Sequence, residues 1–314
     1  MGTWDGSGLP PAAAARLRRA QQSWVATSLL SVPSALGLAA VGFDPVGEVM
    51  GCVVTQLGWQ AYGGCGMWTS GLQLGYGLSA PVITSRSPGY GGFGGYVEAL
   101  SGGFATALAR MVAEATALGA DGVVGVKLTA APLDSQAAGG AREFVALGTA
   151  VRGRCRSRPP TPFTTELRGA ELARLLLAGW TPVALTMGIE VSIRHDDWRT
   201  RSQSGGSLLT SALQANVEVE GYTDLVQQAR AVARADFSDK LVRLGADGAV
   251  ISDFRLRVWE LEPAENHIDH AAEAVLTGTA IARLNAQPPG AARGASPSTD
   301  ARRPLTILPL RQHH

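Results

Sequence analysis

Two long amphipathic segments dominate the pattern of apolar and polar positions along the chain. In residues 97–118 and 226–244, apolar side chains recur every three or four positions. This spacing places them on one face of an α-helix. Gly119 and Gly245 follow the two segments, where a glycine can adopt a positive φ angle and end a helix. The pattern therefore predicts two long helices with glycine stops.

Shorter apolar runs predict the strands around these helices. The expected strands lie at residues 46–56, 123–129, 144–151, 183–194, 250–261 and 274–282. A short amphipathic helix is predicted at 169–178. A weaker counterpart in the first half is interrupted by Pro33 and Gly37. A helix followed by two strands that a loop connects implies an α+β fold with mainly antiparallel sheets.

One phrase, Leu-Gly-Ala-Asp-Gly, occurs at Leu118 and again at Leu244. Other blocks recur in the same order, such as 42–46 with 179–183 and 148–151 with 278–281. The recurrence predicts an internal duplication, in which each domain has the order β-α-β-α-β-β. The expected organisation is an N-terminal extension at 1–23, a first domain at 24–154 with a glycine-rich insertion at 58–95, a linker at 155–160, a second domain at 161–285, and a disordered Pro/Gly/Ala-rich tail at 286–314.

Composition narrows the classes of partner. The net charge is +1 and only 17% of residues are charged, which argues against binding driven by neutralising nucleic-acid phosphates. No run reaches the ~18–20 apolar residues of a membrane span. Three cysteines are too few and odd in number for a disulfide framework. We therefore expect a cytoplasmic protein that binds neither nucleic acid nor membrane.

The recurring blocks resemble the YbjQ family, whose members are often described as heavy-metal-binding domains. The resemblance rests on the helix starts at Tyr96 and Tyr222, the phrases at 118–125 and 244–251, and the Gly-Thr-Ala endings at 148–150 and 278–280. It implies a tandem YbjQ-like protein and, because small members of the family look like ring-forming oligomers, a homo-oligomer. These positions are turn, cap and packing residues, so the resemblance indicates a fold more than a chemistry.

The loop expected between the last two strands of the second half carries most of the candidate chemistry. It contains His267, Asp269 and His270. Imidazole and carboxylate groups are donors that zinc accepts in proteins, so these three residues are the predicted ligands of a divalent transition metal such as zinc. The alternative is a solvated acidic loop with two exposed histidines. A second polar loop, 195–197, would strengthen the metal hypothesis if it lay nearby.

Other motifs give weaker signals. The insertion at 58–95 lacks the Gly-Lys-[Ser/Thr] of a phosphate loop and is expected to pack at an oligomer contact or to stay mobile. Cys65 and Met67 could offer sulfur donors to copper(I). No Ser-His-Asp, Cys-His or paired-carboxylate arrangement can be defended, so we expect no catalytic activity. An uncharacterised hydrolase is the third hypothesis.

The leading interpretation is a non-enzymatic, self-assembling protein that binds a heavy metal or a small ligand through loops of the second domain. The alternative is a metal-free scaffolding oligomer. Its apolar tail segment, residues 302–311, would dock a protein partner. Such a segment can bind a groove or the edge of a sheet.

Overall fold

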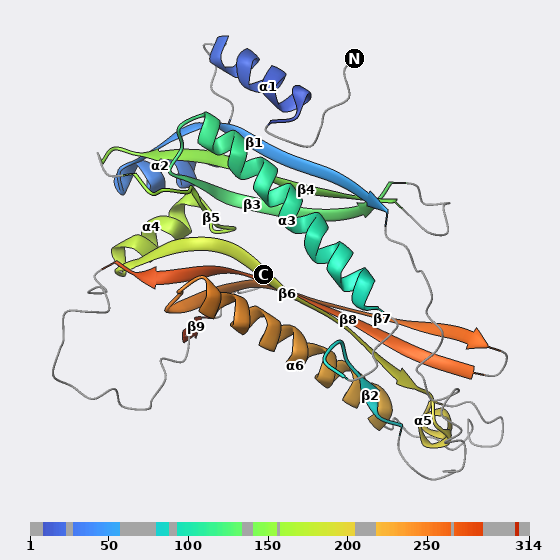
Figure 1. Ribbon diagram of the computed structural model, residues 1–314. Helices are drawn as coiled ribbons and strands as arrows, with labels where there is room; N and C mark the ends of the chain where they lie inside the picture. Colours follow the sequence, from blue (N-terminus) through green and yellow to red (C-terminus); the bar gives the residue numbers. More distant parts are fainter. Residues whose placement is uncertain are drawn as a thin grey trace.

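The computed structural model describes residues 9–22, 28–56, 80–87, 93–133, 141–155, 158–204, 218–264, 267–284 and 305–307. These residues form a mixed α+β fold with two sheets and six helices. Figure 1 shows the long helix α3 running diagonally from the first sheet toward the second, and the long helix α6 against the second sheet. The α+β class expected from the sequence is confirmed.

The first sheet has four strands in the order β1-β4-β3-β5. The strands are β1 (Phe43–Gln56), β3 (Gly122–Pro132), β4 (Ala141–Gly153) and β5 (Phe163–Thr164). β4 pairs antiparallel with both β1 and β3, whereas β5 runs parallel to β3. The helix α3 (Gly94–Ala117) packs on β1 and β4.

The second sheet has five strands in the order β2-β6-β8-β7-β9. The strands are β2 (Val82–Ile83), β6 (Trp180–His195), β7 (Gly248–Ala264), β8 (His267–Arg283) and β9 (Leu305–Ile307). β9 runs parallel to β7, and the other pairs are antiparallel. The remaining helices are α1 (Pro11–Gln22), α2 (Val32–Ala40), α4 (Gly169–Leu177), α5 (Trp198–Gln203) and α6 (Glu220–Arg243).

The two long helices confirm the helical pattern of the sequence. α3 and α6 end one residue before Leu118 and Leu244 respectively. Gly119 and Gly245 then adopt φ angles of 66° and 64°. A residue with a Cβ rarely adopts this conformation, so glycine favours the helix stop there.

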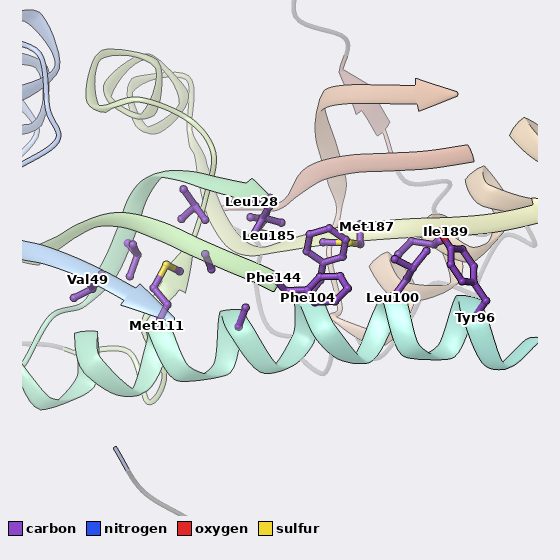
Figure 2. Close-up of a cluster of buried hydrophobic side chains, with 14 of the residues drawn as sticks. Val49, Tyr96, Leu100, Phe104, Met111, Leu128, Phe144, Leu185, Met187 and Ile189 are labelled. Carbon is purple, nitrogen blue, oxygen red and sulfur yellow. The ribbon is translucent and has the colours of Figure 1, made fainter. Parts of the chain in front are cut away.

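One hydrophobic core joins the two sheets through α3. Figure 2 shows Tyr96 and Leu100 of α3 beside Ile189 of β6. Phe104 meets Phe144 of β4 edge to face, with ring centroids 5.0 Å apart. The Tyr96 hydroxyl also donates a hydrogen bond of 2.8 Å to a carboxylate oxygen of Glu273 in β8. α3 is therefore covered by apolar side chains of both sheets.

The division into two separate domains, each with the element order β-α-β-α-β-β, is not confirmed. β5, which was expected to open the second half, completes the first sheet by pairing with β3. β2 lies in the insertion of the first half, yet it pairs with β6 in the second sheet. An apolar run predicts a strand but not the neighbour of that strand. The unpaired N–H and C=O groups at a sheet edge can form hydrogen bonds with any segment that lies beside them. Each sheet therefore contains a strand from the other half of the chain.

Two glycines allow the long helices to lie directly on their sheets. A Cβ added to Gly51 would lie 2.0 Å from the carbonyl oxygen of Ala107 in α3. A Cβ added to Gly188 would lie 2.0 Å from the carbonyl oxygen of Ala233 in α6. Both contacts are with helix backbone, which cannot rotate away as a side chain can.

Gly188→Ala is expected to lower the free energy of unfolding by about 1–3 kcal/mol, because α6 must move away from β6. Chemical denaturation followed by circular dichroism measures this change. Gly102→Ala is the matched control, since nothing lies within 4 Å of an added Cβ at this exposed position of α3. It is expected to stabilise the protein by roughly 0.5–1 kcal/mol. Equal stability of Gly188→Ala and the unaltered protein would contradict this account of the packing.

Candidate functional site

A row of buried polar side chains runs along β6 at one end of the second sheet. Glu190, Ser192 and Arg194 alternate with the apolar residues of β6, so they share the side of the strand on which Gly188 meets α6. The exposed fractions of Glu190 and Arg194 are 0% and 2%. Buried polar groups of this kind need hydrogen-bond partners, and segments outside the sheet supply them.

Glu190 is held by the segment that contains β2. Its carboxylate accepts hydrogen bonds from the backbone N–H of Ser85 at 2.8 Å and from the Ser85 hydroxyl. The Ser192 hydroxyl donates a third hydrogen bond at 3.1 Å. Burial raises the pKa of Glu190 above its usual value, and these hydrogen bonds only partly oppose the shift.

Arg194 and Asp197 fix the short helix α5 to the same row. Arg194 donates hydrogen bonds to Thr200 at 2.7 Å and to Asp197 at 2.8 Å. Asp197 also accepts from the backbone N–H groups of Thr200 and Ala80, so it caps α5 and anchors the segment of β2. Burial acts to raise the pKa of Asp197, but these hydrogen bonds and Arg194 outweigh it, and the pKa is lowered.

Two histidines and a carboxylate meet at the same end of β6, on the opposite face of the second sheet from this row. Asp269 Oδ1 lies 3.0 Å from His195 Nδ1 and 3.0 Å from His267 Nε2. The two imidazole rings lie with their centroids 4.4 Å apart. His267 and Asp269 share a face of β8, and Asp269 is opposite His195 in the β6–β8 register. The donor atoms of the three residues lie within 4.8 Å of one another.

The predicted ligand set His267, Asp269 and His270 does not converge. These residues lie in strand β8 rather than in a loop, and alternate residues of a strand point to opposite faces. His270 therefore turns away and places Nδ1 3.0 Å from Asp196 Oδ1, where the Tyr222 hydroxyl also donates to Asp196 at 2.9 Å. The polar loop at 195–197 does lie nearby, and His195 takes the place expected for His270.

The cluster of His195, His267 and Asp269 offers donors that suit a divalent transition metal such as zinc. It offers three donors, whereas a structural zinc site in proteins uses four. The hydrogen bond between His195 and Asp269 also ties β6 to β8 without an ion. Metal binding here therefore stays a prediction. Cys65 and Met67, the other proposed metal donors, lie outside the described residues.

Charged side chains of the long helices protect two sheet edges. At the free edge of β1, Arg110 donates to the carbonyl of Cys52, and Glu114 accepts from the N–H of Met50 at 3.0 Å. Along the part of β6 that β2 does not pair, Lys240 donates to the carbonyl of Met187 at 2.8 Å. Polar groups at an edge are otherwise open to pairing with another chain. These two edges are therefore poor surfaces for assembly.

Short parallel strands cover part of the other two edges. β5 pairs with β3 from Gly122, and β9 pairs with β7 from Gly248. β9, part of the predicted tail segment, lies on the edge of β7 in its own chain, and docking of the tail onto a partner stays a prediction. Beyond Val250, the described residues supply no strand on this side of β7.

An uncovered apolar surface lies on α2. Val32 and Leu36 are 73% and 66% exposed, and Leu29 just before the helix is 48% exposed. Val32 and Leu36 are four positions apart and share one side of the helix. α2 contains no charged residue, and this was the sequence signal that could have identified the surface. Exposed apolar groups on one side of a helix mark a candidate interface.

Glu190→Gln is expected to reduce the loss of stability that accompanies rising pH. Because the pKa of Glu190 is raised in the folded protein, the folded state keeps a proton that the unfolded state releases near pH 4.5. Stability therefore falls as the pH rises from 4.5 through the folded pKa, and glutamine removes this contribution. Thermal unfolding midpoints measured between about pH 4.5 and 8 test the prediction.

Glu98→Gln provides the matched control, because Glu98 is exposed on α3. It should keep the pH dependence of the unaltered protein. An unchanged pH dependence in Glu190→Gln would show that Glu190 does not titrate as its burial implies.

Comparison with known proteins gives one family match and one relative along nearly the whole chain. Residues 84–154 match the YbjQ_1 family, described as "Putative heavy-metal-binding". Encapsulin nanocompartment protein Rv1762c of Mycobacterium tuberculosis is 32% identical over 288 residues, which cover 88% of this chain and 92% of the relative. No solved structure gives a significant match.

These findings correct two expectations. The family match covers one segment and gives no second copy at 161–285, so a tandem YbjQ-like duplication is not supported. The expected function of binding a heavy metal or small ligand through second-half loops is contradicted by a relative that is named for a nanocompartment.

None of the helices in the described ranges combines the length and apolar character that a membrane span requires. The identity of 32% extends over most of both chains. The chain therefore belongs to the family of the mycobacterial encapsulin nanocompartment protein.

Proposed function

We propose that the protein is the subunit of a self-assembling protein shell, with a structural rather than an enzymatic role. The observation that carries this proposal is the relative, which is named as a nanocompartment protein and is matched over 92% of its length. Since the match is not confined to one segment, the two chains share an architecture and not only a motif.

The surface of the chain supports assembly. A shell subunit must place apolar side chains where other copies can cover them. Val32, Leu36 and Leu177 are 73%, 66% and 80% exposed. They belong to α2 and α4, which pack together beside the first sheet. Burying such side chains contributes about 1.5–3 kcal/mol for each residue of this size.

The edges of the sheets limit how copies can associate. The charged side chains Arg110, Glu114 and Lys240 occupy backbone groups of β1 and β6. Unregulated strand pairing at these edges would give open fibres rather than closed particles. Their protection favours assembly through side-chain surfaces, which can fix one geometry.

The test is the mass of the full chain, purified without an affinity tag, at micromolar concentration. Light scattering coupled to size exclusion is expected to give a mass many times the 32.6 kDa of one chain. Negative-stain electron microscopy is expected to show hollow particles of uniform size. A monomer mass over the whole concentration range would overturn the proposal, and so would solid aggregates without a defined shape.

A further inference from the structure

The contact between α2 and α4 shows how two short helices of this fold pack against each other. A Cβ added to Gly37 of α2 would lie 2.8 Å from Cα of Ala170 in α4. A Cβ added to Gly169 of α4 would lie 2.2 Å from the carbonyl oxygen of Ser34 in α2. The two helix backbones therefore lie in direct contact. Leu38 and Leu172 are buried together with Val124 and Val151 of the first sheet.

β5 positions α4 beside α2. β5 pairs with β3 from Gly122, and the chain then continues into α4. The first sheet is thus completed by a strand followed by a helix. Thr165, next to β5, forms a 2.9 Å hydrogen bond with Thr279 of the second sheet. The strand and the helix together connect the first sheet to the second.

Within the described residues, the second sheet has a strand placed like β5 but no helix placed like α4 after it. β9 pairs with β7 in the register that β5 uses on β3, since Leu305 is opposite Gly248 as Phe163 is opposite Gly122. The sequences also agree, with Pro-Phe-Thr at 162–164 and Pro-Leu-Thr at 304–306. No helix follows β9 within the residues that the structure describes.

The exposed side of α2 corresponds in position to the side of α4 that packs against α2. α2 and α4 each contain nine residues and begin 137 positions apart, at Val32 and Gly169. Val32 and Leu36 thus stand where α4 has Gly169 and Ala173, and both of these α4 residues are buried. A helix that is apolar on all sides is usually buried on all sides, whereas the outward side of α2 is open.

We propose that copies join head to tail, with the outward side of α2 in one copy packing against α4 of the next copy, beside β9. This inference rests on the proposed self-assembly and gives it a direction. The receiving side of α4 carries Glu171 and Arg174, at the positions of Ser34 and Gly37 in α2. The larger Val32 at the position of Gly169 sets this helix pair farther apart than α2 and α4 within one chain. Such a contact joins two different surfaces and continues from copy to copy.

Disulfide trapping tests the direction of the contact. Cys52, Cys65 and Cys155 are first replaced by serine. In this background, Val32→Cys combined with Glu171→Cys is expected to give a ladder of covalent dimers, trimers and larger species on a non-reducing gel. Each single variant is expected to give monomer only.

Two results of the trapping would overturn the proposal while the assembly stands. Dimers from Val32→Cys alone would show that α2 meets α2 of another copy. Only monomers from the double variant, in particles of normal mass, would show that α2 and α4 of different copies do not meet.

A charge placed on the outward side of α2 tests the energy of the contact. Leu36→Asp is expected to raise the concentration needed for assembly at least about tenfold, a change of 1.4 kcal/mol. The secondary structure should stay intact by circular dichroism. Val242→Asp is the matched control, because Val242 is 69% exposed on α6, and its assembly should be unchanged.

The two proposals fail in different ways. If the unaltered chain has only a monomer mass, self-assembly itself is refuted, and the head-to-tail contact with it. If the unaltered chain assembles and Leu36→Asp assembles equally well, only the α2 contact is refuted.

Discussion

The fold depends on one face of α3 that packs against both sheets. Most helices that cover a sheet pack on one sheet, but the buried face of α3 places Tyr96, Leu100 and Phe104 among apolar residues from both. α6, which covers only the second sheet, buries fewer large side chains and carries charges on its open side. Neither sheet can be removed without exposing the core of the other, so the subunit is a single packed body.

The exchange of strands between the two halves reinforces this unity. β2 brings Ser85 to the buried Glu190, and β5 brings Thr165 to Thr279. Because Glu190, Thr165 and Thr279 are buried, loss of either segment leaves polar groups unsatisfied at a cost of about 1–3 kcal/mol each. The exchanged strands therefore stabilise the pairing of the halves through polar contacts, in addition to the apolar core around α3. In the proposed shell, such rigidity would keep the surfaces that meet other copies in a fixed relation.

The sequence predicted local structure well, and the long-range arrangement less well. The positions of α3, α6 and their glycine stops follow from periodicity and from the φ angles that glycine allows. The partners of β2 and β5 could not be predicted, because a two-residue strand is too short to show an apolar pattern that would indicate its neighbour in a sheet. The site at His267 was misjudged for a related reason. Residues 267–270 were predicted to form a loop, but they lie in β8, where strand alternation turns His270 away from Asp269.

The pairing of β2 with β6 has a consequence for synthesis on the ribosome. Val82 and Arg194, which are partners in the sheet, are more than a hundred positions apart. At ~5–20 residues per second, β2 leaves the ribosome on the order of ten seconds before its partner exists. The first half therefore waits as an unfinished body with part of α3 uncovered. Emergence of β6 supplies the partner of β2, but β6 pairs along its length with β8 (His267–Arg283), so the second sheet is completed only near the end of translation.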